Sequence, residues 1–269
     1  MDLSILIPIY RWDCRQLISD LNQQAQALGI SYEILQANDE ELRLGRASIR
    51  NYLAEQAKGD RLLFIDCDAA VDNPAFLSTY MKHADEAPVI CGGLHHADQL
   101  PSPDVSLRYA YEKHADRQRG AVYRRQHPYA RFTPFNFLIL RDLFLRIRFN
   151  EDVKEYGHED TLFGAELERR KIPILHIDNP LLHEGLESNE HFMEKTRTAL
   201  RTLKQYEQQL ANYSSLVAIR AKLRQMHLDK LVGQLFLHWR PRIEHRLCFS
   251  LHPSLILFKI YKLGFYCQL

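Results

Sequence analysis

The sequence has little of what secreted and membrane-spanning proteins depend on. Its 269 residues include five cysteines, an odd and widely spaced set without a CxxC pair, so neither a disulfide framework nor a zinc knuckle is indicated. We therefore expect reduced thiols and a cytoplasmic protein. No basic leader precedes the short apolar run at the start, and charges and a proline interrupt the apolar stretch near the other end. The sequence thus predicts neither a signal peptide nor a transmembrane helix.

An excess of charge of one sign is also absent. The chain has 35 basic and 34 acidic residues, which gives no support for a dedicated nucleic-acid binder. The distribution is uneven, because thirteen Lys and Arg face five acids from Glu190 onward. Internal repeats and low-complexity tracts are not found either. A chain of this length suits one α/β domain that buries a real core, with room for an extension.

Apolar runs and amphipathic stretches alternate along the first hundred residues. This alternation indicates strands joined by helices, and it favours a parallel sheet with helices on both faces. The predicted strands are 3–10, 32–37, 61–65 and 88–94, and the predicted helices are 14–28, 47–57 and 75–83.

Periodicity is lost over residues 95–131, which we expect to form a long, partly mobile loop or an irregular helix. Beyond it, the patterns predict strands at 135–140 and 172–177, helices at 141–148 and 160–170, and one long helix from His191 to about Leu231 followed by an aromatic, basic tail. We expect a catalytic domain over 1–190, with halves at 1–94 and 95–190, and a helical extension over 191–269.

Two acids stand one residue apart where an apolar strand ends, in LLFIDCDAAVD. Side chains at i and i+2 of a strand share a face, so Asp66 and Asp68 should emerge together. Such a pair suits Mg²⁺ or Mn²⁺, which take oxygen ligands and keep water or phosphate in their other positions. In the alternative, one acid caps the turn and the other is solvated. Two other strand ends, at Pro8 to Tyr10 and at Asn38-Asp39, should line the same crevice.

The segment GRASIRNYLAEQAKGDRLLFIDCDAAVD resembles family 2 glycosyltransferases, which have the GT-A fold. The residues that carry the resemblance are Arg50-Asn51, Gly59-Asp60 and the Asp-x-Asp element, and Pro8 stands near the end of the first strand, as in the family. A second element, YGHEDTLFGAEL, is similar to the Gly-x-Glu-Asp element of galactosyltransferase-like members. The resemblance covers roughly residues 3–185 and implies a mixed, mainly parallel sheet flanked by helices.

The resemblance implies roles around a metal ion. Asp68 would bind the cation directly, Asp66 would contact the ribose or the metal through water, and His183 would be a further ligand, although a lone histidine is more often structural. Asp160 would take the proton of the acceptor hydroxyl, with Glu159 beside it in the catalytic element. The alternative for Asp160 is a helix cap with no further role.

Donor-binding residues follow from the same resemblance. Pro8, Tyr10 and Asp39 would hold the uracil and ribose, although the chain has Asn-Asp-Glu-Glu after its second strand where the family more often has Asp-Asp-Gly-Ser. Arg46 or Arg50 would lie near the phosphates, because a guanidinium binds phosphate by paired hydrogen bonds. The alternative for Arg50 is that it braces the carboxylates.

The implied function is inverting, metal-dependent transfer of a sugar of the Gal, GalNAc, Glc or GlcNAc type. The donor would be a UDP-sugar and the acceptor a saccharide or lipid-linked hydroxyl, as in surface polysaccharide biosynthesis. Alternatives are an inactive nucleotide- or saccharide-binding relative and, as a poor fit, a haloacid-dehalogenase-like phosphatase. Residues 108–131 would form either an acceptor-binding lid or a solvated loop. The tail over 235–266 would rest on an anionic membrane surface, pack on the catalytic domain, or bind a second subunit.

Overall fold

The computed structural model describes all residues from 1 to 269, and the chain divides into two compact units. The chain passes between the two units several times. Unit 1 comprises Met1–Ala97, Asp116–Lys154 and Glu159–Gly185, and unit 2 comprises Asp98–Ala115, Glu155–His158 and Leu186–Leu269. The ranges expected from the sequence, a catalytic domain over 1–190 and a helical extension over 191–269, stay a prediction.

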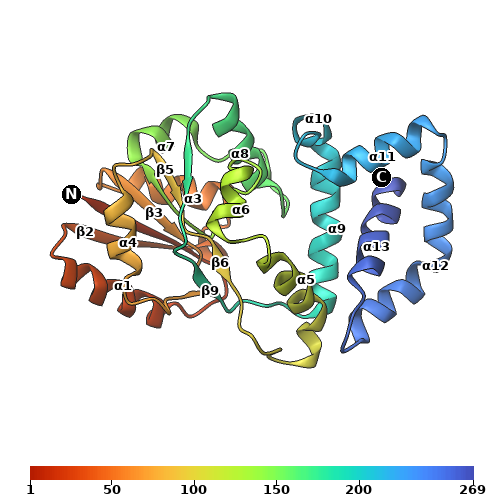
Figure 1. Ribbon diagram of the computed structural model, residues 1–269, viewed down its shortest axis with the longest axis horizontal. Helices are drawn as coiled ribbons and strands as arrows, with labels where there is room; N and C mark the ends of the chain where they lie inside the picture. Colours follow the sequence, from red (N-terminus) through yellow and green to blue (C-terminus); the bar gives the residue numbers. More distant parts are fainter. The chain divides into compact units, whose positions relative to one another are not determined.

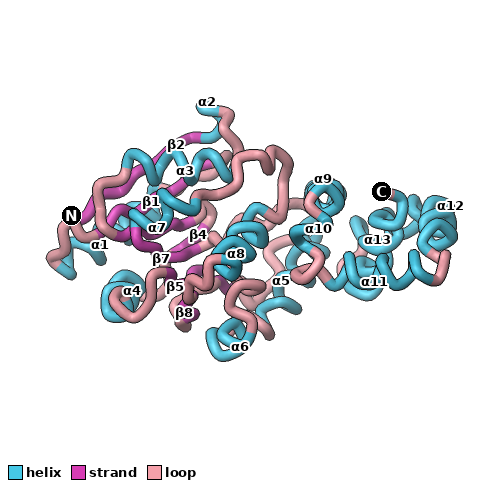
Figure 2. The backbone as a smooth tube through the Cα atoms, turned by 90° about the horizontal axis from the view of Figure 1, so that it is seen from above, coloured by secondary structure: helices cyan, strands magenta, loops and turns pink.

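Unit 1 is built on a six-stranded sheet of order β2-β1-β3-β7-β5-β8. Only β7 runs antiparallel to its neighbours, so the sheet is mixed and mainly parallel, and the predicted fold class is confirmed. Figure 2 shows β2, β1, β7, β5 and β8 following one another across the unit in this order. The strands are β1 (Leu3–Ile9), β2 (Tyr32–Asn38), β3 (Arg61–Ile65), β5 (Val89–Cys91), β7 (Asn136–Leu140) and β8 (Ile174–His176).

Helices cover both faces of this sheet (Figure 1). Alternate residues of β3 serve the two sides: Leu63 and Ile65 join a core that includes α1 and α4, whereas Leu62 and Phe64 join a core that includes α3, α7 and α8. A residue that continues the second set, such as Asp66, is directed toward α3. The helices of unit 1 are α1 (Arg15–Leu28), α2 (Asp39–Leu42), α3 (Arg46–Gln56), α4 (Phe76–His83), α6 (Ala121–Gln126), α7 (Arg141–Ile147) and α8 (Glu159–Arg169).

A second, three-stranded sheet of order β4-β9-β6 stands at the end of β3. Its strands are short: β4 (Ala69–Ala70), β6 (Leu94–His95) and β9 (Leu181–His183). Ala69 pairs with His183 across the β4–β9 ladder, and His95 pairs with Leu182 across the β6–β9 ladder. The pairing of β4 with β9 therefore places Asp68, which precedes β4, beside His183, 115 positions later in the sequence.

Residues 95–131, expected to form a long, partly mobile loop or an irregular helix, contain regular helices. The segment contains a 3-10 turn, Pro103–Val105, followed by α5 (Ser106–Asp116) and α6. Arg124 of α6 is 3 % exposed, and its guanidinium donates to the backbone carbonyls of Cys91, Gly92 and Ile177. A buried charge whose donors reach three carbonyls ties α6 to β5 and to the end of β8. This part of the segment is therefore built into unit 1.

Unit 2 is helical, and the expected continuous helix from His191 to Leu231 is interrupted. Its helices besides α5 are α9 (Asn189–Gln205), α10 (Glu207–Leu210), α11 (Ser215–Gln225), α12 (Asp229–Phe249) and α13 (Leu255–Gln268). Helices α9, α12 and α13 lie against one another (Figure 1). Gly233 and Gly264 permit the close approach of α12 and α13, because a Cβ at Gly264 would overlap the ring of Phe236.

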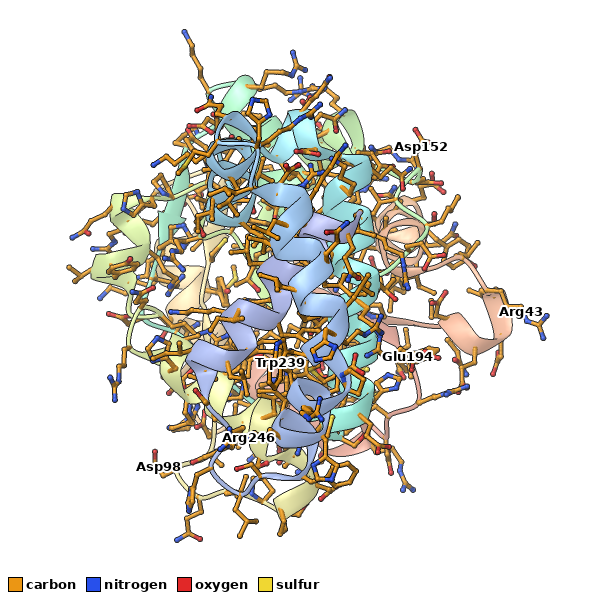
Figure 3. All side chains as sticks on the ribbon, turned by 90° about the vertical axis from the view of Figure 1, so that its right-hand side faces the viewer. Arg43, Asp98, Asp152, Glu194, Trp239 and Arg246 are labelled. Atoms are coloured by element: carbon orange, nitrogen blue, oxygen red, sulfur yellow. The ribbon has the colours of Figure 1, made fainter.

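The aromatic residues of the C-terminal part divide between core and surface. Phe258, Tyr261 and Phe265 of α13 are at most 5 % exposed and form the core of unit 2, whereas Trp239 and Phe249 of α12 are 52 % and 67 % exposed. Figure 3 looks onto α12 and α13 and labels Trp239. None of the helices combines the length and the apolar character that a bilayer span requires.

Candidate active site at the end of β3

The predicted pair of acids begins one residue beyond β3. Asp66 is anchored by its backbone N–H, which donates to the carbonyl of Phe135 at 2.9 Å. Its carboxylate accepts from Nη2 of Arg50 at 2.5 Å, and Nη2 of Arg46 lies 3.9 Å away. Both arginines come from the first turns of α3, on the face to which the β3 alternation directs Asp66. Asp66 thus forms a cluster of charged side chains with Arg46 and Arg50, on the face of the sheet that α3 covers.

Arg50 is the most deeply buried member of this cluster. Its side chain is 2 % exposed, and it also donates to the carbonyl of Arg46 at 3.0 Å. Of the two roles considered for Arg50, the structure shows the bracing contact with Asp66. Arg46 differs, because 45 % of its side chain is exposed and can meet a ligand.

The first acid of the Gly-x-Glu-Asp element joins the same cluster. Oε1 of Glu159 accepts from Nε of Arg46 at 2.9 Å, and Glu159 is 7 % exposed. Burial raises the pKa of Glu159, but the charges of Arg46 and Arg50 lower it by more, so the net shift of the pKa is downward. The negative charges of Asp66 and Glu159 therefore balance the positive charges of the two arginines. Glu159 orients the guanidinium of Arg46.

The second acid of the Asp-x-Asp pair faces a histidine. Because Ala69 pairs with His183, the residue before Ala69 lies beside β9, and Oδ2 of Asp68 is 3.2 Å from Nε2 of His183. Burial raises the pKa of Asp68, whereas the hydrogen bond and charge of His183, together with the charge of Arg46, lower it more. The carboxylate of Asp68 is therefore held ionised against a ring nitrogen.

Gly185 closes over this pair from the loop after β9. A Cβ at Gly185 would lie 2.8 Å from both Cβ and Cγ of Asp68 and would overlap its carboxylate. The backbone N–H of Glu184 donates to the carbonyl of Asp68 at 3.0 Å. The loop after β9 thus fits tightly around Asp68 only because residue 185 has no side chain.

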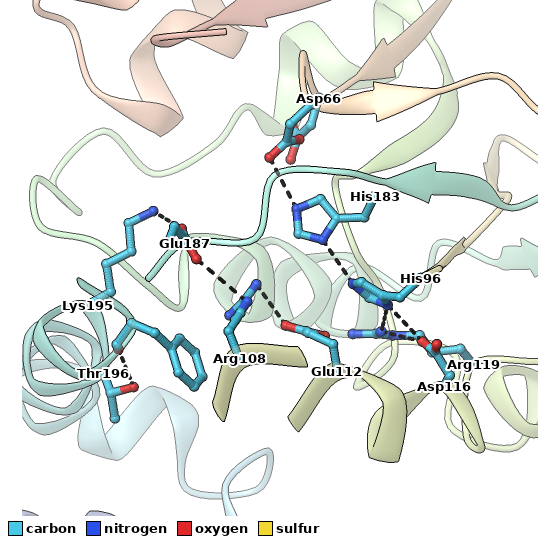
Figure 4. Close-up of polar contacts among 12 residues, drawn as sticks. Asp66, His96, Arg108, Glu112, Asp116, Arg119, His183, Glu187, Lys195 and Thr196 are labelled. Carbon is cyan, nitrogen blue, oxygen red and sulfur yellow. Dashed lines mark hydrogen bonds and ion pairs between the residues drawn. The ribbon is translucent and has the colours of Figure 1, made fainter. Parts of the chain in front are cut away.

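A second histidine fixes the ring of His183. His96 follows β6 directly, and its Nε2 is 2.9 Å from Nδ1 of His183, while its Nδ1 is 3.0 Å from Oδ1 of Asp116 (Figure 4). Arg119 donates to the same carboxylate at 2.7 Å. Although burial raises the pKa of Asp116, the hydrogen bonds from His96 and Arg119 lower it to about 2, so the carboxylate is an acceptor only.

The contacts around His96 are compatible with either tautomer of the two rings. Nδ1 of His96 lies 3.0 Å from Oδ1 of Asp116, an acceptor, and 3.1 Å from Nη1 of Arg119, a donor. In both tautomers Nδ1 of His183 meets His96, and Nε2 of His183 faces the carboxylate of Asp68 at 3.2 Å. A proton or a metal ion between Nε2 and the carboxylate oxygen stabilises this arrangement.

The other predicted residues lie at neighbouring strand ends. Leu6 pairs with Phe64, so the same register continued puts Pro8 level with Asp66, and Tyr10 follows with its side chain exposed. Oδ1 of Asp39, in α2 after β2, accepts from the backbone N–H groups of residues 44 and 45 at 3.0 and 2.8 Å. The structure therefore places the strand-end residues along one edge of the sheet, as the parallel topology requires.

Asp160 lies in the first turn of α8. Its Oδ1 accepts from the backbone N–H and the hydroxyl of Thr161, at 2.6 and 3.1 Å. The side chain is therefore oriented by its own helix terminus, where backbone amides favour an ionised carboxylate. The adjacent acids of the element have different partners, since Glu159 contacts Arg46 and Asp160 contacts α8.

The donor chemistry of Asp68 and His183 fits a divalent cation. An octahedral ion with bonds of about 2.1 Å has neighbouring ligand atoms about 3 Å apart, close to the separation observed here. One oxygen and one neutral imidazole nitrogen suit Mn²⁺ or Mg²⁺ with the remaining positions open. No group of three His, Cys, Asp or Glu side chains is arranged to hold a metal by itself. Asp66 is turned toward Arg50 instead.

Several residues of this site carry no signal in the sequence. The two-residue ladders of the small sheet bring His96 to His183 and Gly185 to Asp68. Asp116 and Arg119 join the site only through their contacts with His96. Ladders this short have no apolar alternation from which their pairing could be predicted. A pair of histidines after Gly92-Gly93 is the one hint, and it does not indicate a partner.

Comparison with protein-family models and with curated proteins finds no match. Among solved structures, the chain is similar to mannosyl-3-phosphoglycerate synthase from Rubrobacter xylanophilus, with a TM-score of 0.50 and 11% identity over 77% of this chain and 75% of that one. It is also similar to S. aureus TarS residues 1–349 (TM-score 0.48, 15% identity, 99% and 89% covered). The catalytic domain of Drosophila beta1,4galactosyltransferase 7 gives 0.45 and 14% over 71% and 72%. The likeness to the synthase confirms the fold predicted from the sequence.

Proposed function

We propose that this protein is a glycosyltransferase that moves a sugar from a UDP-sugar to an acceptor hydroxyl with the help of a divalent cation. One observation carries the proposal: in a fold similar to that of mannosyl-3-phosphoglycerate synthase, Oδ2 of the second acid of an Asp-x-Asp element lies 3.2 Å from Nε2 of His183. The contact with His96 fixes the ring of His183 so that its Nε2 faces Asp68.

The donor would lie along the carboxyl ends of β1, β2 and β3. Tyr10 offers an exposed ring to the uracil, and Pro8 and Asp39 stand at the neighbouring strand ends. Arg46 would meet the diphosphate, because its side chain is half-exposed and Glu159 fixes its orientation. Arg50 is too deeply buried for that role and keeps Asp66 in place. Asp66 would contact the ribose, or the metal through water.

Asp68 and His183 would hold Mn²⁺ or Mg²⁺, with diphosphate oxygens and water as the other ligands. When bound, the cation would neutralise the negative charge that develops on the departing UDP. The chain itself supplies the orientation of both ligand atoms, through β4, β9 and the contact with His96.

Transfer would proceed with inversion. The acceptor oxygen attacks the anomeric carbon, the bond from that carbon to the diphosphate oxygen breaks, and UDP leaves with the bonding electrons. Asp160 would accept the proton of the acceptor hydroxyl, since its carboxylate is held at the start of α8. We propose a sugar of the Gal, GalNAc, Glc or GlcNAc type and a saccharide or lipid-linked acceptor in polysaccharide synthesis.

An inactive relative that only binds a nucleotide or saccharide is the second candidate, because the same cradle would serve binding alone. We do not favour the phosphatase alternative, because the Asp-x-Asp element follows the third strand in chain order, and the fold is similar to that of mannosyl-3-phosphoglycerate synthase. Turnover therefore decides between the two candidates.

Asp68→Ala tests the proposal, with Asp85→Ala as the matched control, because the side chain of Asp85 is 95% exposed and contacts Arg61 at the start of β3, the end of the strand opposite to Asp66 and Asp68. UDP release from a panel of UDP-sugars is measured with Mn²⁺ and with excess EDTA, beside the thermal shift caused by UDP. We expect metal-dependent turnover and a metal-dependent shift in the wild type and in Asp85→Ala, and loss of both in Asp68→Ala. Full turnover in EDTA would remove the metal role, and a thermal shift without turnover would favour the inactive relative.

A further inference from the structure

A stripe of large apolar side chains runs along the solvent-facing side of α12. Leu231, Leu235 and Trp239 recur every fourth residue and are 50 %, 56 % and 52 % exposed, and Phe249 extends the stripe at 67 %. The opposite side of α12 is the one that packs, since Phe236 and Leu247 are buried. Unit 2 therefore presents an apolar helix face that none of its own elements covers.

The same stripe carries basic side chains that have no acidic partner. Arg242 and Arg246 lie one and two turns beyond Trp239 and make no ion pair, and the Arg242 guanidinium stacks over the Trp239 ring at 5.4 Å. On the packed side the pattern is different, because Arg240 and Arg197 both pair with Glu244. The outward side of α12 contains no acid, so its positive charge is not neutralised within the protein.

The turn after α12 and the start of α13 continue this surface. Leu251, Ile256 and Ile260 are 58 %, 72 % and 52 % exposed. A cavity of about 400 Å³ joins the two helices, since its lining includes Arg246 from α12 together with Ile256 and Ile260 from α13. Figure 3 looks onto this surface, with Trp239 and Arg246 labelled. We call it the α12–α13 face, defined by residues 231, 235, 239, 242, 246, 249, 251, 256 and 260.

We propose that the α12–α13 face binds the surface of an anionic lipid bilayer. Aliphatic and Trp side chains on an amphipathic helix insert at the boundary between headgroups and acyl chains, while Arg and Lys meet lipid phosphates. Residues 215–269 supply nine basic and two acidic residues, which gives this end of the chain the charge that such a surface attracts. This inference is independent of the proposed transferase activity, because it uses residues of unit 2 only.

Two other occupants fit the face less well. A second copy of this chain in a two-fold dimer would bury Arg242 and Arg246 of both copies in one interface, where the face offers no acid to pair with them. A nucleic acid would match the arginines, but its phosphate backbone offers nothing to Leu231, Leu235 and Ile256, whose burial must drive the association.

The test uses the full chain and vesicles of phosphatidylcholine, either alone or mixed with phosphatidylglycerol. We expect co-sedimentation with the mixed vesicles only, weakened by salt. Arg242→Glu/Arg246→Glu should reduce the partition by about 30-fold or more, at roughly 1 kcal/mol for each lost cation. The matched control Lys58→Glu/Lys82→Glu makes the same change in net charge at exposed positions of unit 1 and should leave binding within about twofold.

Trp239 supplies a second readout, because the chain has only one other tryptophan, Trp12. In a Trp12→Phe background, the emission of Trp239 should shift to the blue with anionic vesicles. Leu231→Ala/Leu235→Ala should abolish that shift while leaving far-ultraviolet circular dichroism unchanged. Equal loss in both charge-reversal variants, or an unshifted Trp239, would overturn the proposal. So would sedimentation showing a stable dimer that Arg242→Glu/Arg246→Glu dissociates.

Discussion

Loss of Asp66 should destabilise the protein more than loss of Asp68, although the two acids belong to one sequence motif. Asp66 neutralises Arg50, whose side chain is 2 % exposed and lies 2.5 Å away. Removing one partner of a buried pair leaves an uncompensated charge and costs about 3–5 kcal/mol. Arg50 keeps its bond to the Arg46 carbonyl, and Glu159 remains nearby, so we expect the lower end, about 3 kcal/mol, for Asp66→Ala.

Asp68 contributes less than Asp66 to the stability of the fold. Its side chain is 28 % exposed, and its contact with His183 is a single one at 3.2 Å. Asp68→Ala should therefore lower the free energy of unfolding by at most about 1 kcal/mol. The expected difference in unfolding free energy between the two variants is about 2 kcal/mol, which is large enough for urea titrations to resolve.

Urea unfolding followed by tryptophan fluorescence and by far-ultraviolet circular dichroism measures both values, provided the two probes give coincident transitions. A double-mutant cycle adds the decisive term: Arg50→Met/Asp66→Leu should be less destabilised than the sum of its single variants by about 2 kcal/mol. Equal losses in Asp66→Ala and Asp68→Ala, or additive losses in the cycle, would refute the assignment of Arg50 as a brace.

Three further predictions concern the site directly. Asp160→Asn should keep the metal-dependent thermal shift by UDP and lose transfer by about 10²- to 10⁴-fold, and unchanged turnover would reassign the base. His96→Phe removes the partner of His183 and should weaken Mn²⁺ binding by about 10- to 100-fold in calorimetry with UDP present, whereas an unchanged affinity would make His96 a packing residue. Gly185→Ala should displace Asp68 and raise the metal requirement, which an unaltered Mn²⁺ titration of activity would contradict.

The sheet of unit 1 could be predicted because its strands are buried on both faces and read as apolar runs. Residues 61–65 were predicted as a strand with both bounds correct, and the acids at its end follow from the period of two. The direction of β7 could not be predicted. Phe137 to Ile139 is apolar in either direction, so the sequence does not show that β7 runs antiparallel to β3.

The site was predictable to the extent that it lies at strand ends. The sequence predicts Asp66, Asp68 and His183 as one group. It does not predict that the two acids have different partners: Asp66 contacts the arginines of α3, and Asp68 contacts His183 of the small sheet. Local sequence does not encode that separation, because it depends on which way each carboxylate turns after the strand. The helical breaks in unit 2 were missed for a similar reason, since α9, α10 and α11 are separated by short turns without proline or glycine.

The central claim is that Asp68 and His183 together hold a divalent cation against the diphosphate of a UDP-sugar. Crystals grown with UDP and MnCl₂ and measured at the manganese absorption edge test it most directly. We predict an anomalous peak bonded to Oδ2 of Asp68, to Nε2 of His183 and to diphosphate oxygens. A peak elsewhere, or bound UDP whose diphosphate is remote from both side chains, would contradict the account.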